Sequence, residues 1–364
     1  MRVPFANPSL HYSQHKKEIS KVIDDVLSRG DLILRKDVED FENNIANFVG
    51  TKYAIGLNSG TDALFLSLKA AGISPGDEVI TVAHTFVASI AAIVHCGAKP
   101  LLVDVGEDFL MDVEKVEPVI TQKTKAIIPV HFNGRVCDME KLMEIAAKHN
   151  LIVIEDAAQA LGAKFGGRVA GSIGLTGCFS LYPFKILGAF GDGGIVTTND
   201  EKINQKIRLL RDHGQKTKTE LVCYGWNSRL DNLQAAILNI KFKYLSDWIK
   251  KRQEIANLYN QGLSDTLGVQ IPPKLDGKHF DIYQNYVLRA QKRDELAGFL
   301  KEKGIETLIK DPVPLHHHPA LGLSHFQLPY TETLSKEVIS LPIYPELSTE
   351  QVEYVIENVR KFYG

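Results

Sequence analysis

Leu151-Ile152-Val153-Ile154-Glu155-Asp156 is a short apolar run that ends in two carboxylates. Four comparable runs precede it, and stretches with helical periodicity separate them: Tyr53–Leu57, Glu78–Val82, Pro100–Asp104 and Ala126–Val130. Mostly apolar strands that alternate with helices are typical of a parallel sheet covered on both faces. The sequence therefore predicts an α/β protein with a mostly parallel central sheet flanked by helices.

The segments on either side complete this prediction. Two further strands, Cys178–Tyr182 and Gly194–Thr198, lie about eleven residues apart, which is too short for a helical crossover and predicts an antiparallel or irregular pair. Apolar faces at helical spacing predict two helices before the first strand, which end at Gly30 and Gly50. After the sheet we expect one long helix from about Asp231 to Leu263, then a strand near 283–288 and helices over 293–303 and 349–362. We therefore predict a large domain, 1–240, and a small C-terminal α+β domain, 241–364.

Composition excludes several classes of protein. The chain has 364 residues and a net charge of -2, which predicts neither a nucleic-acid nor a membrane partner. No window approaches the run of about 20 apolar residues that a membrane span needs, and the start lacks a signal-peptide core. The four cysteines are scattered and form no CxxC pair: Cys96, Cys137, Cys178 and Cys223. We interpret them as reduced thiols of a cytoplasmic protein and expect no structural zinc site.

Three segments carry candidate chemistry. The first, Asn58–Leu64, follows a predicted strand and opens a predicted helix, so its free amides and its hydroxyl groups can bind a phosphate. Simple capping of the helix by Ser59 or Thr61 is the alternative interpretation. The second is Asp156, at the carboxyl end of a strand, where open α/β sheets bind their ligands. There it can pair with a protonated ring nitrogen, or merely cap the next helix.

The third segment contains Lys185 in the apolar, aromatic run Ser180–Gly188, which continues into the glycine-rich turn Gly191–Gly194. Desolvation lowers the pKa of a lysine in such a setting, and a neutral lysine can form an imine. An ordinary surface lysine is the alternative. A phosphate cradle, an anion for a pyridinium nitrogen and an imine-forming lysine are together what pyridoxal 5'-phosphate requires. We therefore predict this cofactor, bound to Lys185 as a Schiff base and passing through its pyridoxamine phosphate form in turnover.

The order of motifs resembles the DegT/DnrJ/EryC1/StrS sugar aminotransferases, which belong to the fold type I class of pyridoxal-phosphate enzymes. The resemblance covers nearly the whole chain. Besides the segments above, it rests on Pro75–Ile80, His84–Ser89, Glu155–Gln159, Arg211–Gly214, Asn227–Asp231 and Leu341–Pro345. It implies transfer of an amino group from L-glutamate to a 3-keto- or 4-keto-sugar, usually nucleotide-linked in this class of enzyme, for the synthesis of amino sugars of lipopolysaccharide, other surface glycans or natural products.

The resemblance also implies the roles of individual residues. Lys185 and Asp156 would be the catalytic pair, with Asp156 on the ring nitrogen. The remaining cofactor contacts would be Gly60, Thr61 and Ser180 at the phosphate, Phe86 stacked on the ring, Gln159 near the phenolic oxygen, and Asn227. Asn227 would reach the cofactor of a neighbouring subunit, so a homodimer with shared sites is implied. Arg229 and His316 are candidate substrate contacts.

The sequence departs from the family pattern at a few positions. Phe184 stands where a small or hydroxylated residue is usual, and Ala83, followed by His84, stands where a proline is usual two places before Thr85. The tract His316-His317-His318 follows a Pro-Leu pair that usually precedes a single histidine. Neighbouring residues of an extended segment point in alternating directions, so we expect no metal site there. His213 and Tyr182 are either pocket residues or ordinary packing.

Two other functions remain open on the sequence alone. A dehydratase of the same family carries histidine in place of the Schiff-base lysine, and the presence of Lys185 opposes that interpretation. A regulatory protein without turnover could dispense with Lys185 and Asp156, yet both are present. The sequence leaves undetermined whether C3 or C4 of the sugar is aminated, and which nucleotide it carries.

Overall fold

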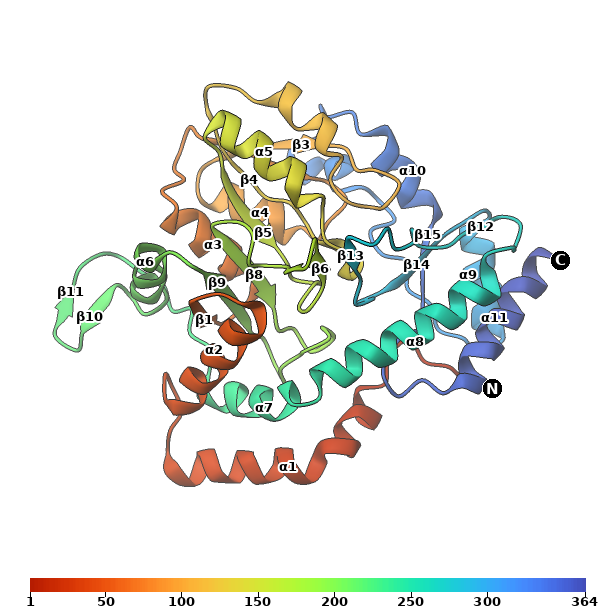
Figure 1. Cartoon of the computed structure of the whole chain (residues 1–364), viewed down its shortest axis with the longest axis horizontal. Helices are drawn as coiled ribbons and strands as arrows, with labels where there is room; N and C mark the ends of the chain where they lie inside the picture. The colour runs from red at the N-terminus through yellow and green to blue at the C-terminus, as the bar shows by residue number, and fades with distance from the viewer.

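A central sheet of seven strands organises the molecule (Figure 1). The computed structural model describes all residues from Met1 to Gly364. The strand order is β1-β9-β8-β5-β4-β2-β3, with the bounds β1 Tyr53–Leu57, β2 Glu78–Val82, β3 Lys99–Val103, β4 Thr124–Ile127, β5 Ile152–Asp156, β8 Thr176–Ser180 and β9 Gly194–Thr198. The strands from β3 to β8 pair in parallel, which confirms the predicted α/β class.

The last two pairs of the sheet are antiparallel. β8 and β9 pair in this way, as their short connection predicts. The sequence did not reveal that β1 joins the edge antiparallel to β9, with Leu57 opposite Gly194. This pairing brings the end of β1, and the turn that follows it, beside the glycine-rich segment. A Cβ on Gly194 would lie 2.1 Å from the Ser59 carbonyl oxygen, so only glycine permits this approach.

Helices cover both faces of the sheet. One face packs on α3 (Gly60–Ala70), α4 (Ala88–His95) and α6 (Glu201–Arg211), and a cluster of buried aliphatic side chains lies between them and the strands. The opposite face contributes to the largest cluster, which includes residues of α2 (Lys36–Val49), α5 (Met139–His149) and α7 (Asn232–Phe242). Burial of both faces explains why the strands are apolar without alternation.

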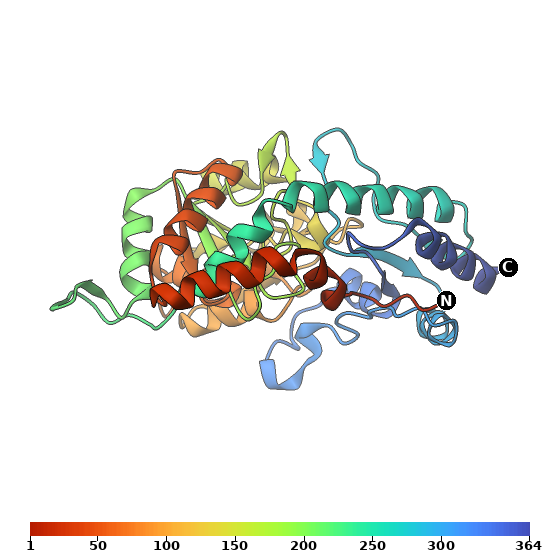
Figure 2. The same ribbon diagram turned by 90° about the horizontal axis from the view of Figure 1, so that it is seen from below.

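The N-terminal helices end where the sequence predicts. α1 (Pro8–Arg29) and α2 are followed by Gly30 and Gly50, whose φ angles of 68° and 83° are left-handed. Left-handed backbone after a helix favours glycine because glycine has no Cβ to clash. Figures 1 and 2 both show α1 lying alongside α7 at one side of the molecule.

The predicted single helix from Asp231 to Leu263 is wrong. The structure has two helices, α7 and α8 (Leu245–Leu263), separated by Lys243 and Tyr244. The amide of Tyr244 bonds to the carbonyl of Lys241 instead of continuing the α-helical pattern, and its hydroxyl group donates to Glu18 of α1. A tertiary contact with α1 thus accompanies a break that no proline or glycine marks in the sequence.

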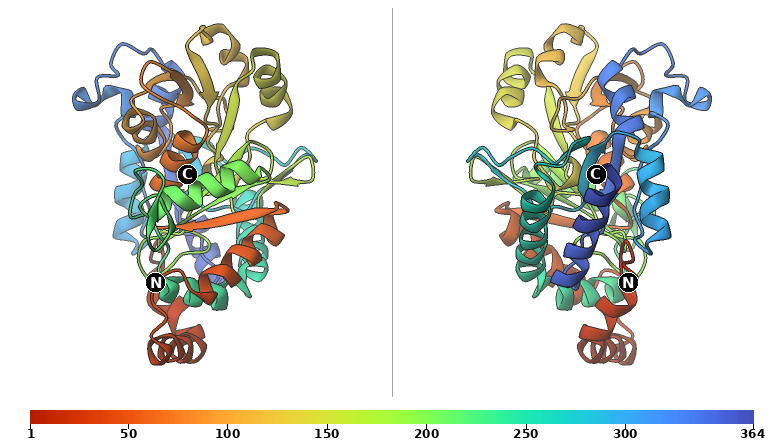
Figure 3. Two further views of the ribbon diagram at one scale, coloured as in Figure 1. Left: turned by 90° about the vertical axis from the view of Figure 1, so that its left-hand side faces the viewer. Right: turned by 90° about the vertical axis from the view of Figure 1, so that its right-hand side faces the viewer.

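The C-terminal part has a core of its own. Its sheet consists of β12 (Val269–Gln270), β14 (Tyr286–Ala290) and β15 (Val338–Leu341), and its helices are α8, α9 (Arg293–Glu302), α10 (Pro329–Glu337) and α11 (Thr349–Tyr363). Figure 3 shows α11 between α8 and α9 in its right-hand view. The N-terminal Val3 also belongs to this core, because it pairs with Ile305. The division at residue 240 stays a prediction.

Short strands complete the fold. β6 (Lys164–Phe165), β7 (Arg168–Val169) and β13 (His279–Phe280) form a small sheet, and β10 (Gln215–Thr217) with β11 (Glu220–Leu221) forms a hairpin that projects from the body (Figures 1 and 2). None of the helices combines the length and the apolar character needed to cross a membrane.

Candidate active site

A cavity of about 700 Å³ opens where the parallel strands end. Asp156 and Ser180 are the last residues of β5 and β8, and both line it. The N-terminus of α3 closes one side. The C-terminal part contributes Lys310, Ile343 and Tyr344. The cavity therefore lies at the carboxyl edge of the sheet, which is the usual ligand site of open α/β folds.

The first turn of α3 offers free backbone amides to this cavity. The Ser59 hydroxyl accepts a hydrogen bond from the Asp62 amide at 3.0 Å, and the first helical bond runs from the Ala63 amide to the Ser59 carbonyl. The amides of Gly60 and Thr61 precede both of these bonds and remain free for an anion. A Cβ on Gly60 would lie 2.8 Å from the Cβ of Ser180, so glycine allows the helix to approach β8.

Asp156 is buried and held from one side. Its Oδ2 accepts a hydrogen bond from the Ser89 hydroxyl at 2.6 Å, and its Oδ1 accepts one from the Ala158 amide at 3.2 Å. Ser89 itself contacts Thr85, 2.8 Å away. These bonds fix the carboxylate of a residue that lines the cavity. In the sequence, Ser89 and Thr85 stand out only as parts of a motif, because nothing local indicates that they support Asp156.

Gln159 is oriented by its carbonyl end. Its Oε1 accepts from the Asn133 amide at 2.9 Å and from Asn285 Nδ2 at 3.3 Å. Gln159 lines the cavity, and its Nε2 makes no hydrogen bond within the chain. The side chain therefore presents a free donor to a ligand oxygen.

Lys185 lines the same cavity as Asp156. Burial, aided by the charge of Lys310, lowers the pKa of its amine to about 8. The flanking backbone is clamped by Gln284, whose Oε1 accepts from the Ile186 amide at 2.8 Å and whose Nε2 donates to the Phe184 carbonyl at 2.9 Å. The sequence gives no signal for Gln284, because it lies about a hundred residues from the turn that it holds.

A buried pair stiffens the strand end beside Asp156. His131 Nε2 donates to Glu155 at 2.9 Å, since its Nδ1 accepts from the Cys137 amide. Burial would raise the pKa of Glu155, but His131 and the backbone amides of Gly171 and Gly174 hold it below its usual value. An ionised carboxylate with several donors anchors the loop after β7 (Arg168–Val169) to β5.

Exposed aromatic rings surround the cavity. Phe86, Tyr182 and Phe184 line it, although each ring is about half exposed to solvent. A ring such as Phe86 can stack on a flat ligand. Exposed apolar surface of this kind is also typical of an interface.

The remaining candidate residues lie outside the cavity lining. Asn227 is exposed and forms an isolated bridge with Asp212, while Arg229 Nη1 pairs with Asp212 Oδ1 at 2.8 Å. His213 is exposed in the left-handed conformation beside them. Within one chain, Asn227 and Arg229 are thus absent from the lining that contains Lys185, although the Asn227 carbonyl accepts from Asn58 Nδ2 at 3.5 Å.

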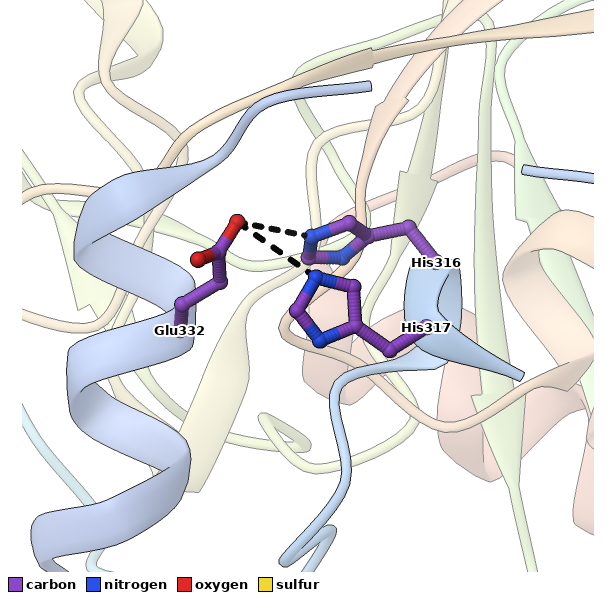
Figure 4. Close-up of side chains that lie close together, drawn as sticks. All are labelled: His316, His317 and Glu332. Carbon is purple, nitrogen blue, oxygen red and sulfur yellow. Dashed lines mark hydrogen bonds and ion pairs between the residues drawn. The ribbon is translucent and has the colours of Figure 1, made fainter. Parts of the chain in front are cut away.

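His316 is fully buried and faces α10 (Figure 4). The expectation of an extended histidine tract is wrong, because residues 315–317 form a 3-10 turn. Both His316 and His317 point toward Glu332, with Nε2–Oε1 distances of 3.3 and 3.5 Å. Potential ligand atoms of these three residues lie within 4.8 Å of one another. A contact of His316 with substrate stays a prediction.

These residues fit pyridoxal phosphate. The amides of Gly60 and Thr61 match its phosphate, Asp156 matches its pyridine nitrogen, and the Gln159 amide matches its phenolic oxygen. The amine of Lys185, with its pKa lowered to about 8, is suited to bind its carbonyl carbon. The close approach of Gly60 to Ser180 brings the amides of α3 and the Ser180 hydroxyl to one place, as a phosphate requires.

Comparison with known proteins agrees with this fit. The model of the DegT/DnrJ/EryC1/StrS aminotransferase family matches residues 13–360. The chain is 45% identical to a pleiotropic regulatory protein of Geobacillus stearothermophilus, with 100% of this chain and 99% of that protein covered. It is 40% identical to dTDP-3-amino-3,4,6-trideoxy-alpha-D-glucose transaminase of Streptomyces venezuelae, covering 99% and 96%. It is 42% identical to dTDP-3-amino-3,6-dideoxy-alpha-D-galactopyranose transaminase of Aneurinibacillus thermoaerophilus, covering 99% of each.

Solved structures show the same fold. S. venezuelae DesV in complex with a ketimine intermediate superposes with a TM-score of 0.97 at 40% identity, covering 100% of this chain and 98% of that one. Bacillus subtilis NtdA with the bound cofactor PMP gives a TM-score of 0.92 at 31% identity, covering 98% and 84%. The similarity therefore extends over the entire chain, and it includes proteins that hold the cofactor which the cavity fits.

Proposed function

Since this chain belongs to the DegT/DnrJ/EryC1/StrS aminotransferase family, we propose that it transfers the amino group of L-glutamate to the C3 carbonyl of a nucleotide-linked keto-sugar. The observation that carries the proposal is one cavity shared by Lys185, Asp156 and the free amides of α3. The names of both transaminase relatives place the amino group at C3. That position, rather than C4, is therefore our proposal.

Each residue of the cavity has a task in this reaction. We propose that Gly60, Thr61 and Ser180 bind the phosphate of the cofactor and that Phe86 and Gln159 orient its ring. When bound, pyridoxal phosphate supplies an electron-accepting ring. Asp156 stabilises the positive charge of the ring nitrogen, because Ser89 and the Ala158 amide hold its carboxylate in place.

Lys185 acts as the acid–base group. A lysine whose pKa lies near 8 is partly neutral at physiological pH, so its Nζ can take the proton from Cα of the amino donor and later return one to the acceptor carbon. Gln284 keeps the backbone on both sides of this lysine fixed.

Asn227 and Arg229 lead to a second part of the proposal. Neither residue lines the cavity of its own chain, and Asn227 is exposed. We propose that they complete the site of a neighbouring subunit in a homodimer, with Asn227 on its cofactor phosphate. The half-exposed rings at the cavity support an interface there. Mixing inactive Lys185→Ala with inactive Asn227→Ala should partly restore activity through mixed dimers, and no recovery after proven subunit exchange would oppose shared sites.

We further propose that the enzyme works in the cytoplasm and that its amino sugar enters a surface glycan such as lipopolysaccharide. Free cysteines are typical of that compartment. Sugar nucleotides are made there, so the proposed acceptor agrees with it.

An absorbance experiment tests the main proposal. The protein with pyridoxal phosphate should absorb visible light, lose this band on addition of L-glutamate, and recover it with a nucleotide-linked 3-keto-sugar. Recovery only with 4-keto-sugars would reassign the position of transfer. A band that L-glutamate leaves unchanged would refute the proposed donor. The complete absence of a band would favour the regulatory function that the Geobacillus relative's name describes.

A further inference from the structure

Lys310 brings a second desolvated amine into the cavity. It follows Leu308, which exchanges backbone hydrogen bonds with Ser340 of β15, so the C-terminal part holds it in position. Its Nζ lies 4.4 Å from the centre of the Phe132 ring. Lys310 makes no ion pair and no hydrogen bond, and the carboxylates of Asp311 and Asp156 act on it only through space. A desolvated ammonium group without an anion is unusual unless a ligand supplies one.

The other cations that line the cavity are already engaged. Nη1 of Arg252 donates to three backbone carbonyls, at 2.9 to 3.2 Å. Lys185 is required by the cofactor. Arg252 forms no ion pair either, but backbone carbonyls hold its Nη1. The Lys310 amine has no hydrogen-bond partner within the chain, which makes it the lining cation most free to pair with an anionic substrate.

The position of Lys310 limits which substrate anion it meets. Lys310 and Lys185 line the same cavity, and the positive charge of Lys310 helps to lower the pKa of the Lys185 amine. In an amino acid the α-carboxylate is bonded directly to the carbon that reacts at Lys185. The diphosphate of a nucleotide sugar and the distal carboxylate of glutamate are several bonds further away. We propose that Lys310 binds the α-carboxylate of the amino donor; this inference rests on the proposed function and names the donor class as α-amino acids.

The same arrangement assists Lys185 between substrates. Burial and the charge of Lys310 both lower the pKa of the Lys185 amine, which favours its neutral, reactive form. When the donor carboxylate arrives, it neutralises Lys310. Lys310 thus favours the neutral form of Lys185 before the donor binds and offers a positive charge to the arriving carboxylate.

The experiment compares Lys310→Met with wild type in the holoenzyme. Methionine is an unbranched side chain one atom shorter than lysine, so it can still contact Phe132, but it carries no charge. Lys310→Arg restores the charge. Lys164→Met serves as the control, because Lys164 is exposed and lies 5.5 Å from the Phe280 ring, outside the cavity lining. Thermal unfolding establishes that all variants are folded.

Three donors separate the two carboxylates of glutamate: L-glutamate has both, L-alanine has only the α-carboxylate, and 4-aminobutyrate has only the distal one. The rate of donor-induced loss of the cofactor band gives kcat/KM for each, and an inhibition constant against L-glutamate replaces it for a compound that does not react. In Lys310→Met we expect a loss of about 30-fold or more for L-glutamate and L-alanine. For 4-aminobutyrate we expect less than about a threefold change, and Lys310→Arg should recover most of the loss.

Other outcomes overturn the inference. A loss confined to L-glutamate and 4-aminobutyrate would assign Lys310 to the distal carboxylate. If Lys310→Met leaves kcat/KM unchanged for all three donors but raises KM for the keto-sugar, Lys310 would be assigned to the acceptor. Equal losses for all three donors would show a structural role only. If wild type itself does not react with L-glutamate, the proposed function fails as well, whereas a reactive wild type with an equally reactive Lys310→Met contradicts only the inference about Lys310.

Discussion

Substitution of Gly60 by alanine tests the phosphate cradle at the start of α3. The added Cβ would lie 2.8 Å from Ser180 Cβ and 3.0 Å from Ser180 Cα, whereas ordinary contacts begin at 3.4 Å. The helix start and β8 must therefore move apart by about 0.6 Å at closest approach. The backbone of Ser180 cannot rotate away as a flexible side chain could, so the shift falls on the helix terminus and its free amides.

The expected effect is on the cofactor more than on folding. A hydrogen bond to a charged group contributes about 1.5–3 kcal/mol, so weakening one of the two amide contacts should reduce the affinity for pyridoxal phosphate by about 10- to 100-fold. Overpacking should destabilise the apoprotein by about 1–3 kcal/mol, partly offset by the helix propensity of alanine. Spectrophotometric titration of apoprotein with the cofactor measures the first effect, and urea unfolding the second.

Gly298→Ala is the matched control. Gly298 lies in helix α9, is exposed, and has no atom within 4 Å of the position that an added methyl group would take. This variant should gain about 0.5–1 kcal/mol and bind the cofactor as wild type does. If Gly60→Ala retained wild-type cofactor affinity, the assignment of the α3 amides to the phosphate would be wrong.

Three further predictions concern the residues around the cofactor. Competitive labelling of the apoprotein should give the Lys185 amine a pKa of about 8. Lys310→Met should raise this pKa, because removal of a nearby positive charge favours the protonated form. A pKa near 10 in wild type would refute the proposed effect of burial and of Lys310 on Lys185. Ser89→Ala removes the 2.6 Å bond to Asp156 and should weaken cofactor binding about tenfold in titration, with no change if the carboxylate needs no support. Gln284→Leu removes both hydrogen bonds that hold the turn at Lys185. This variant should lower kcat about 10- to 100-fold with little change in cofactor affinity. Weaker cofactor binding with an unchanged kcat would instead assign Gln284 to cofactor binding.

The sequence predicted most strands, the ends of the N-terminal helices and two residues of the site, because each depends on residues that are neighbours along the chain. The runs that became β2 to β5 are mostly apolar because both faces of the sheet are covered. Gly30 and Gly50 end helices by their left-handed backbone. Asp156 at a strand end and Lys185 in an uncharged segment could also be predicted, because the residues next to them in the sequence define both positions.

Features that depend on distant contacts were not visible. The break after α7 involves a contact of Tyr244 with Glu18, and no local residue type marks it. Gln284 and Lys310 reach the cavity from a part of the chain that packs separately. The tract at His316 was expected to be extended, but its turn places neighbouring histidines on one side, toward Glu332. Periodicity cannot reveal such pairings, since they are set by tertiary packing.

The pairing of Val3 with Ile305 has a consequence for synthesis of the chain. Val3 is completely buried, and Phe5 and Ala6, which follow it, line the cavity. The partner of Val3 leaves the ribosome some three hundred residues after Val3 itself. At about 5–20 residues per second, the N-terminal segment must wait at least about 15 seconds before it can dock. The sheet can form earlier, whereas the cavity is closed only near the end of translation, so a chain truncated before residue 305 should fold its sheet and still lack a finished site.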